Sequence, residues 1–159
     1  MYSLSFFLFR ASPTGTAIGS NLYIFGGFNG QIFLDDLHVL QIGDEVMTWT
    51  KPETLGTPPT GRSGHTASKV GNCLFLFGGR TRESRFHDVH CLDCGSGNTI
   101  DGLTWREIPV SGKVVARKTH ASALIASKLY VFGGHDGTKW LDDLHIMETD
   151  LPCIRSHMQ

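Results

Sequence analysis

Three short apolar runs stand out in the pattern of hydrophobic and polar positions, and each run ends in a pair of glycines. The runs begin at Leu22, Leu74 and Leu129, and the glycine pairs begin at positions 26, 78 and 133, so they lie 52 and 55 residues apart. Short apolar runs that stop at a turn residue are typical of strands buried on both faces. A motif that returns at this period is typical of a repeated β-unit.

Other segments recur in register with the glycine pairs, and together they predict four short strands in each unit. A strand of small residues precedes the apolar run, a third strand follows it after a variable loop, and Trp49 or Trp105 marks a fourth. Pro- and Gly-rich linkers at 56–59 and 109–112 separate the units. We expect the small-residue strands at 14–18, 66–70 and 121–125, and third strands opening at 35–38, 87–90 and 142–145. Antiparallel sheets of this kind stack radially as the blades of a β-propeller.

The order of these segments resembles the kelch repeat over nearly all of residues 10–149. The units share an Arg-x-x-His segment, the apolar strand with Gly-Gly, an Asp-Leu-His or Asp-Val-His triplet, and the Trp. The resemblance implies an all-β kelch-type β-propeller in which the Gly pair ends the second strand and the Trp lies on the fourth. Two departures are visible: Pro13 stands where the other repeats have His65 and His120, and the third repeat stops before its Trp.

The repeat count predicts an incomplete propeller of two four-stranded blades plus most of a third. We divide the chain into an apolar N-terminal segment (1–9), three kelch repeats within 10–150 (about 10–61, 62–116 and 117–150) and an irregular tail (151–159). Propellers usually have about four to eight blades, so three would leave blade faces open. We expect a fragment or truncated product of a longer kelch protein. Self-association or pairing with further kelch blades, and a missing strand supplied by residues 4–9, are the alternatives.

Composition restricts the class of partner. Apolar residues make up 40% of the chain and charged residues 18%, which is typical of a globular protein rather than a disordered one. The 14 Lys and Arg residues balance 15 acids, so we expect neither a nucleic-acid nor a membrane partner. The four cysteines are too few and too irregular for a disulfide framework. They indicate reduced thiols and a cytoplasmic location, with a nuclear one as the alternative.

The repeated polar residues are interpreted as structural. A residue that recurs at one place in every blade serves the blade, so we expect the repeated Asp to bond turn amides and the repeated His to bridge strands. Cys91 and Cys94, with His87 and His90 nearby, resemble half of a zinc site. Neighbouring strand residues point to opposite faces, however, and no second Cys/His pair follows. We therefore predict no catalytic residue, no metal site and no cofactor.

The best candidates for binding lie in the loops after the Gly pairs, because function on a repeat scaffold lies where the copies differ. The middle loop, 80–86, carries three arginines, whose guanidinium groups suit carboxylates. Arg85 is expected between two aromatic residues at matching positions of the flanking loops. The alternative is a solvated loop in which Glu83 pairs locally. The predicted partner-binding residues are Phe33, Arg80, Arg82, Arg85, His135, Lys139 and Trp140.

Three functions remain open. The first is a non-catalytic module that presents its loops to a peptide or protein partner. The second is a substrate-recognition subunit of a ubiquitin ligase, because Arg80 and Arg85 resemble arginines with which kelch-domain ligase receptors grip a substrate's C-terminal carboxylate. The third is a metal-dependent enzyme, because a few kelch-like propellers bind copper or iron. We rank the enzyme last, since no loop offers converging metal ligands.

Overall fold

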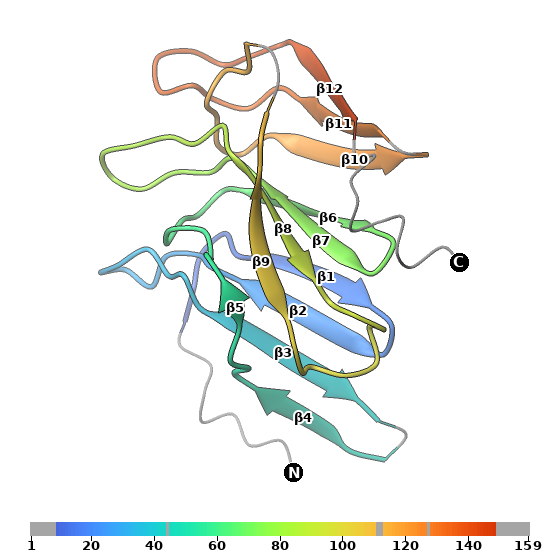
Figure 1. Ribbon diagram of the computed structural model, residues 1–159. Coiled ribbons are helices and arrows are strands. Elements are labelled where there is room, and N and C mark those ends of the chain that lie inside the picture. The colour runs from blue at the N-terminus through green and yellow to red at the C-terminus, as the bar shows by residue number, and fades with distance from the viewer. Residues whose placement is uncertain (1–8, 44, 111–112, 127, 149–159) are drawn as a thin grey trace.

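The computed structural model describes residues 9–43, 45–110, 113–126 and 128–148. These residues form three β-sheets stacked one on another (Figure 1). Every regular element among them is a strand, which confirms the predicted all-β fold of an incomplete propeller. The described part of the chain accordingly contains no helix capable of crossing a membrane.

Each sheet is a blade in which consecutive strands pair antiparallel. The first blade contains β1 (Thr14–Ile18), β2 (Asn21–Phe25), β3 (Leu37–Ile42) and β4 (Met47–Thr50). The second contains β6 (Thr66–Val70), β7 (Cys73–Phe77), β8 (Val89–Asp93) and β9 (Thr104–Ile108). The third contains β10 (Ala121–Ile125), β11 (Lys128–Phe132) and β12 (Leu144–Glu148).

One strand was not expected from the sequence. Residues Leu55–Gly56 form β5, which pairs in parallel with β9 and makes the second sheet five-stranded. The Leu55 amide donates to the carbonyl of Leu103 at 2.8 Å. The chain leaving the first blade therefore covers the outer edge of the second. Two residues are too few to show a hydrophobic period, so only the neighbouring edge reveals this strand.

The hydrophobic core lies between the blades. We call the side of a blade that faces the following blade its forward face, and the side that faces the preceding blade its backward face. The first interface packs Ile18, Tyr23, Phe25, Leu37 and Val39 against residues of the second blade that include Leu74, Leu76, Leu92 and Trp105. The second interface packs Val70, Cys73, Phe75, Phe77, Val89 and Cys91 against Leu129 and Val131.

The expectation that all three apolar strands are buried on both sides holds only for the middle blade. All five residues of β7 are buried, because a blade lies on each side of it. Burial alternates along β2 and β11, since each end blade has one neighbour among the described residues. Three further expectations concern residues outside the described part of the chain. They are the strand at 4–9, of which only Phe9 is described, the tail at 151–159 and any fourth strand of the third repeat.

Candidate binding site on the loops after the glycine pairs

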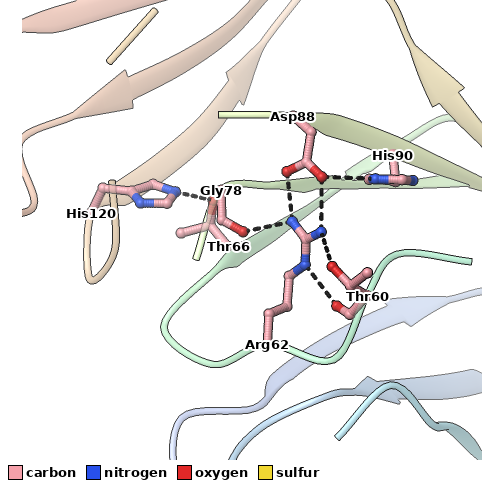
Figure 2. Close-up of polar contacts among 7 residues, drawn as sticks. All are labelled: Thr60, Arg62, Thr66, Gly78, Asp88, His90 and His120. Carbon is pink, nitrogen blue, oxygen red and sulfur yellow. Dashed lines mark hydrogen bonds and ion pairs between the residues drawn. The ribbon is translucent and has the colours of Figure 1, made fainter. Parts of the chain in front are cut away.

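A buried arginine anchors the base of each loop. Arg62, which is 1% exposed, donates from its two terminal nitrogens to both carboxylate oxygens of Asp88 at 2.6 and 2.8 Å (Figure 2). The same guanidinium donates to the carbonyls of Gly78 at 2.9 Å and Thr60 at 3.0 Å. The loop that starts after Gly78 and ends at Asp88 is thereby fixed at both ends.

The same network recurs in the other blades. Arg10 pairs with Asp36 at 2.8 and 3.0 Å, and Arg117 pairs with Asp143 at 2.6 and 2.8 Å. The repeated Asp therefore accepts chiefly from an arginine 26 residues earlier, and the expectation of turn amides as its main partner was wrong. A histidine nitrogen lies 2.8–3.0 Å from each Asp, although at His145 this distance lacks hydrogen-bond geometry. The histidine thus completes the network within its own blade instead of bridging strands.

The hydrogen bonds of this network determine the ionisation state of its aspartates. Burial alone would raise the pKa of Asp88, but hydrogen bonds from Arg62 and His90, together with their charges, outweigh burial and hold that pKa well below its usual range. Asp36 follows the same pattern with Arg10 and His38. The carboxylates of Asp36 and Asp88 are ionised near neutral pH, and both oxygens of each already accept hydrogen bonds from the arginine or the histidine, which suits a structural role.

A second histidine in each Arg-x-x-His segment joins neighbouring blades. Nε2 of His65 lies 3.0 Å from the Thr14 hydroxyl, and Nε2 of His120 lies 2.9 Å from the Thr66 hydroxyl. Burial first, and then nearby Arg62 and His120, lower the pKa of His65 to about 3. Burial and the charge of Arg117 lower that of His120 to about 4. Both rings are therefore neutral near neutral pH.

The variable loops are three small hairpins of the same design. Residues 28 and 33, 80 and 85, and 135 and 140 pair as antiparallel bridges. A polar side chain accepts turn amides in each hairpin: Asn29 from Gln31 and Ile32, Thr81 from Ser84, and Asp136 from Thr138 and Lys139. The hairpins hold the side chains at both bridge positions on one end of neighbouring blades.

The middle hairpin contributes two arginines that reach toward opposite neighbours. The Arg80 guanidinium lies 5.6 Å from the centre of the Phe33 ring in the first hairpin. The Arg85 guanidinium packs against Gly137 of the third hairpin so closely that a Cβ added there would collide with it. Nε of Arg85 is buried and has no hydrogen-bond partner among the described residues.

Lys118 adds a third cation that the sequence did not single out. It forms a bridge with His135, and its pKa is lowered by burial and then by the charges of Arg80 and Arg85. The corresponding residues in the other repeats are Ala11 and Ser63. The presence of a lysine in the third repeat alone could have pointed to Lys118 as a binding residue. It lies, however, in the repeated Arg-x-x-His segment, which the sequence analysis interpreted as structural.

The other predicted residues are placed as follows. Trp140 is 75% exposed and meets the His135 ring edge-on, with centroids 4.9 Å apart. Phe33 is half-buried against Phe28, with centroids 4.7 Å apart. Arg82 and Lys139 are exposed in the turns of their hairpins. Phe33, Arg85 and Trp140 do occupy equivalent bridge positions, but the arginine near Phe33 is Arg80 rather than Arg85.

Arg80, Arg85 and Lys118 form a cationic cluster without a counter-ion among the residues that the structure describes. Within the described chain none of the three forms an ion pair, and Glu83 pairs with none of the loop arginines. Asp136, the acid of the third hairpin, is held ionised with a pKa of about 2 by the Lys139 and Thr138 amides that it caps. An incoming anion would therefore meet guanidinium groups whose charge is not already neutralised.

The cysteine cluster does not assemble a metal site. Cys91 lies in the core between the second and third blades, whereas Cys94 lies in the core between the first and second. Cys73, Cys91 and Cys94 are all buried, and burial raises the pKa of Cys94 to about 12. The described residues contain no group of three or more potential ligands that could hold an ion.

Comparison with known protein families agrees with the blade architecture. The model of the KLHDC2/KLHL20/DRC7 Kelch-repeats domain matches residues 12–155. The chain belongs to the kelch-repeat family. This match supports a kelch-repeat protein-interaction module.

Several curated proteins are similar to this kelch-repeat chain. Tip elongation aberrant protein 1 of fission yeast is 34% identical over 137 residues, covering 85% of this chain and 12% of that protein. Human host cell factor 2 is 34% identical over 160 residues, covering 87% of this chain and 20% of that protein. Human kelch domain-containing protein 3 is 32% identical over 133 residues, covering 80% of this chain and 34% of that protein. The chain thus spans about a tenth to a third of the length of these relatives.

Proposed function

We propose that this kelch-repeat module binds a peptide segment carrying a carboxylate, and that Arg80, Arg85 and Lys118 receive the carboxylate. The observation that carries the proposal is the unneutralised cluster at the junction of three hairpins. Arg forks donate two parallel hydrogen bonds to a carboxylate and give direction as well as attraction.

The surroundings of the cluster suit a peptide. Phe33 and Trp140 flank it on the neighbouring hairpins, and Trp140 is 75% exposed. Exposed aromatic residues beside arginines are the side chains on which binding energy is concentrated in protein interfaces. The free carboxylate would meet the arginines, and the preceding side chains would contact the aromatic residues.

Binding should relieve repulsion within the free protein. Lys118 has a lowered pKa, with burial as the first cause and Arg80 and Arg85 as further ones. A bound carboxylate would favour the charged lysine, so binding would be accompanied by proton uptake at alkaline pH and would weaken with salt.

Fluorescence anisotropy with a peptide library tests the proposal, each peptide being made once with a free C-terminus and once as the C-terminal amide. We expect binding of free acids and a loss of about ten- to a hundredfold for Arg80→Ala or Arg85→Ala, the range for hydrogen bonds to charged groups. Arg106→Ala, which removes an exposed arginine on β9, is the matched control and should bind normally. Equal binding of acid and amide peptides would contradict the proposal.

A narrower candidate is the substrate-recognition subunit of a ubiquitin ligase. It is supported by the arrangement of Arg80 and Arg85, which reach toward opposite neighbouring hairpins and form no ion pair among the described residues. Recovery of a cullin scaffold with the affinity-purified protein would support it. Peptide binding without cullin recovery would support the peptide-binding function and contradict the role in a ubiquitin ligase.

A further inference from the structure

The forward face of the third blade is exposed, although the other two blades bury theirs. Ile125, Phe132, Leu144 and Ile146 are each 53–60% exposed on this face, at the upper end of the stack in Figure 1. Their counterparts, at most 5% exposed, are Ile18, Phe25, Leu37 and Val39 in the first blade and Val70, Phe77, Val89 and Cys91 in the second. An apolar patch of this kind marks an interaction surface.

The backward face of the first blade is exposed in the complementary way. Ile42 and Met47 are 47% and 44% exposed there. The residues in register with them on the second blade, Cys94 and Leu103, are at most 1% exposed because the first blade covers them. The chain therefore carries both halves of a blade junction, one at each end of the stack.

The polar contacts identify which blade fits the open forward face. Both internal junctions contain a threonine–histidine bond, Thr14 with His65 and Thr66 with His120. At the open forward face Ala121 replaces the threonine, and on the first blade Pro13 replaces the histidine. A blade with the usual histidine would bury it opposite a methyl group, which costs free energy. The first blade, with Pro13, leaves no polar group unpaired there.

A second polar contact changes in the same paired way. Ser68 and Ser122 meet across the second junction with their oxygens 3.0 Å apart, and Thr16 donates to the Ala67 carbonyl at 3.5 Å across the first. Strand register makes Ala123 and Gly15 the corresponding residues of the two open faces. Neither open face therefore carries the hydroxyl group found at this position in the second junction, and Ala123 would face Gly15.

Charge at the rim fits the same pairing. Asn21 on the first forward face donates to the Gly97 carbonyl in the loop between β8 and β9. The matching residue of the third blade is Lys128, which is exposed and 2.9 Å from Glu148. The matching loop of the first blade carries Glu45. A lysine facing an acidic loop is favourable at the edge of an interface.

We propose that the forward face of the third blade binds the backward face of the first blade in a second copy of this chain. Each copy offers both faces, so two copies form a head-to-tail dimer of six blades. Head-to-tail contacts close into a ring when the rotation per unit permits it. Six is the multiple of three within the usual range of about four to eight blades, so two copies satisfy every blade face.

Solution mass tests this proposal. We expect light scattering at tens of micromolar to give twice the 17.5 kDa of one chain. Ile146→Lys blocks the forward face and Ile42→Lys blocks the backward face, so each variant alone should be monomeric, and an equimolar mixture should form dimers through the one intact junction. Leu55→Lys, on the exposed outer edge of the middle blade, is the control and should remain dimeric. A monomeric wild-type chain overturns the proposal, as does an Ile42→Lys variant that still dimerises, because that result means face-to-face pairing through the third blade.

A cross-link tests the same junction without disturbing the faces. The doubly substituted chain Gly15→Cys with Ala123→Cys should form a disulfide between chains under mild air oxidation and give a covalent dimer on a non-reducing gel. Ser68→Cys with Ser122→Cys places the same pair inside one chain and should cross-link without changing the mass. Each single substitution measures the background from the native thiols. Cross-linking of the internal pair alone overturns the proposal.

Discussion

Arg62 and Asp88 meet through two hydrogen bonds at 2.6 and 2.8 Å although 26 residues separate them in the chain. The arginine precedes the first strand of its blade, and the carboxylate precedes the third. Because Arg62 also donates to the Gly78 carbonyl, the pair ties the glycine that follows β7 to the residue that precedes β8. The loop with Arg80 and Arg85 leaves from this fixed base.

Removing one member of this pair should destabilise the fold strongly. We expect Asp88→Asn to cost about 3 kcal/mol of unfolding free energy, because it leaves the Arg62 charge buried without its counter-ion. Urea unfolding followed by circular dichroism measures the change. Asp101→Asn, an exposed acid in the loop before β9, is the control. A cost below about 1 kcal/mol, the range of an exposed ion pair, would contradict the buried pair.

The free energy of unfolding should fall when the pH drops below the pKa of the histidines in the unfolded chain. His65 and His120 have pKa values of about 3 and about 4 when folded, against 6.5 for an unperturbed histidine. Between these values the unfolded chain binds protons that the folded chain does not, so stability is full above pH 6.5 and is lost as the pH falls toward 3. Near pH 5 the loss should be about 2 kcal/mol for each histidine.

Urea unfolding at several pH values measures this slope. His120→Gln should reduce the slope because it removes one of the two buried titrating rings. His87→Gln, at an exposed position, should leave it unchanged. Equal stability at pH 7 and near pH 5 would show that the two rings are not held neutral.

The second glycine of the pair should tolerate alanine poorly. Gly79 has φ of +97°, and a Cβ there would lie 2.9 Å from Cβ of His65 and 3.1 Å from the Ser63 carbonyl oxygen. Gly71 also has a positive φ of +58°, but nothing lies within 4 Å of the added atom. Gly71→Ala should therefore cost about 1 kcal/mol from backbone strain alone, and Gly79→Ala clearly more. Thermal unfolding compares the two, and equal costs would mean that blade packing does not select glycine at 79.

Gly137→Ala should weaken peptide binding without removing a charge. Its methyl group would occupy the space of the Arg85 guanidinium and displace it from the cluster. Gly30→Ala is the matched control, because Gly30 holds the same place in the first hairpin, has a similar positive φ and has open space around it. Anisotropy titration should show a several-fold weaker complex for Gly137→Ala alone. Equal affinities for the two variants would place the carboxylate away from Arg85.

The repeat made the strands predictable, but it did not predict the hydrogen-bond partner of the repeated Asp. The small-residue strands expected at 14–18, 66–70 and 121–125 coincide with β1, β6 and β10, because local alternation and flanking turn residues define a strand. The partner of the repeated Asp was assigned wrongly. A turn amide is the nearest local donor in sequence, whereas the actual donor is brought there only by folding of the whole blade.

The sequence by itself determined the all-β blades and their order, since these depend on short-range patterns repeated along the chain, and it located the variable loops that carry Arg80 and Arg85. Only the tertiary structure decided that Lys118 lies near these arginines, that β5 pairs with the edge of the second blade and that apolar side chains are exposed on both end faces. These features depend on residues from different blades meeting across an interface. No period within one blade encodes such a meeting, because it depends on how each sheet packs against the next.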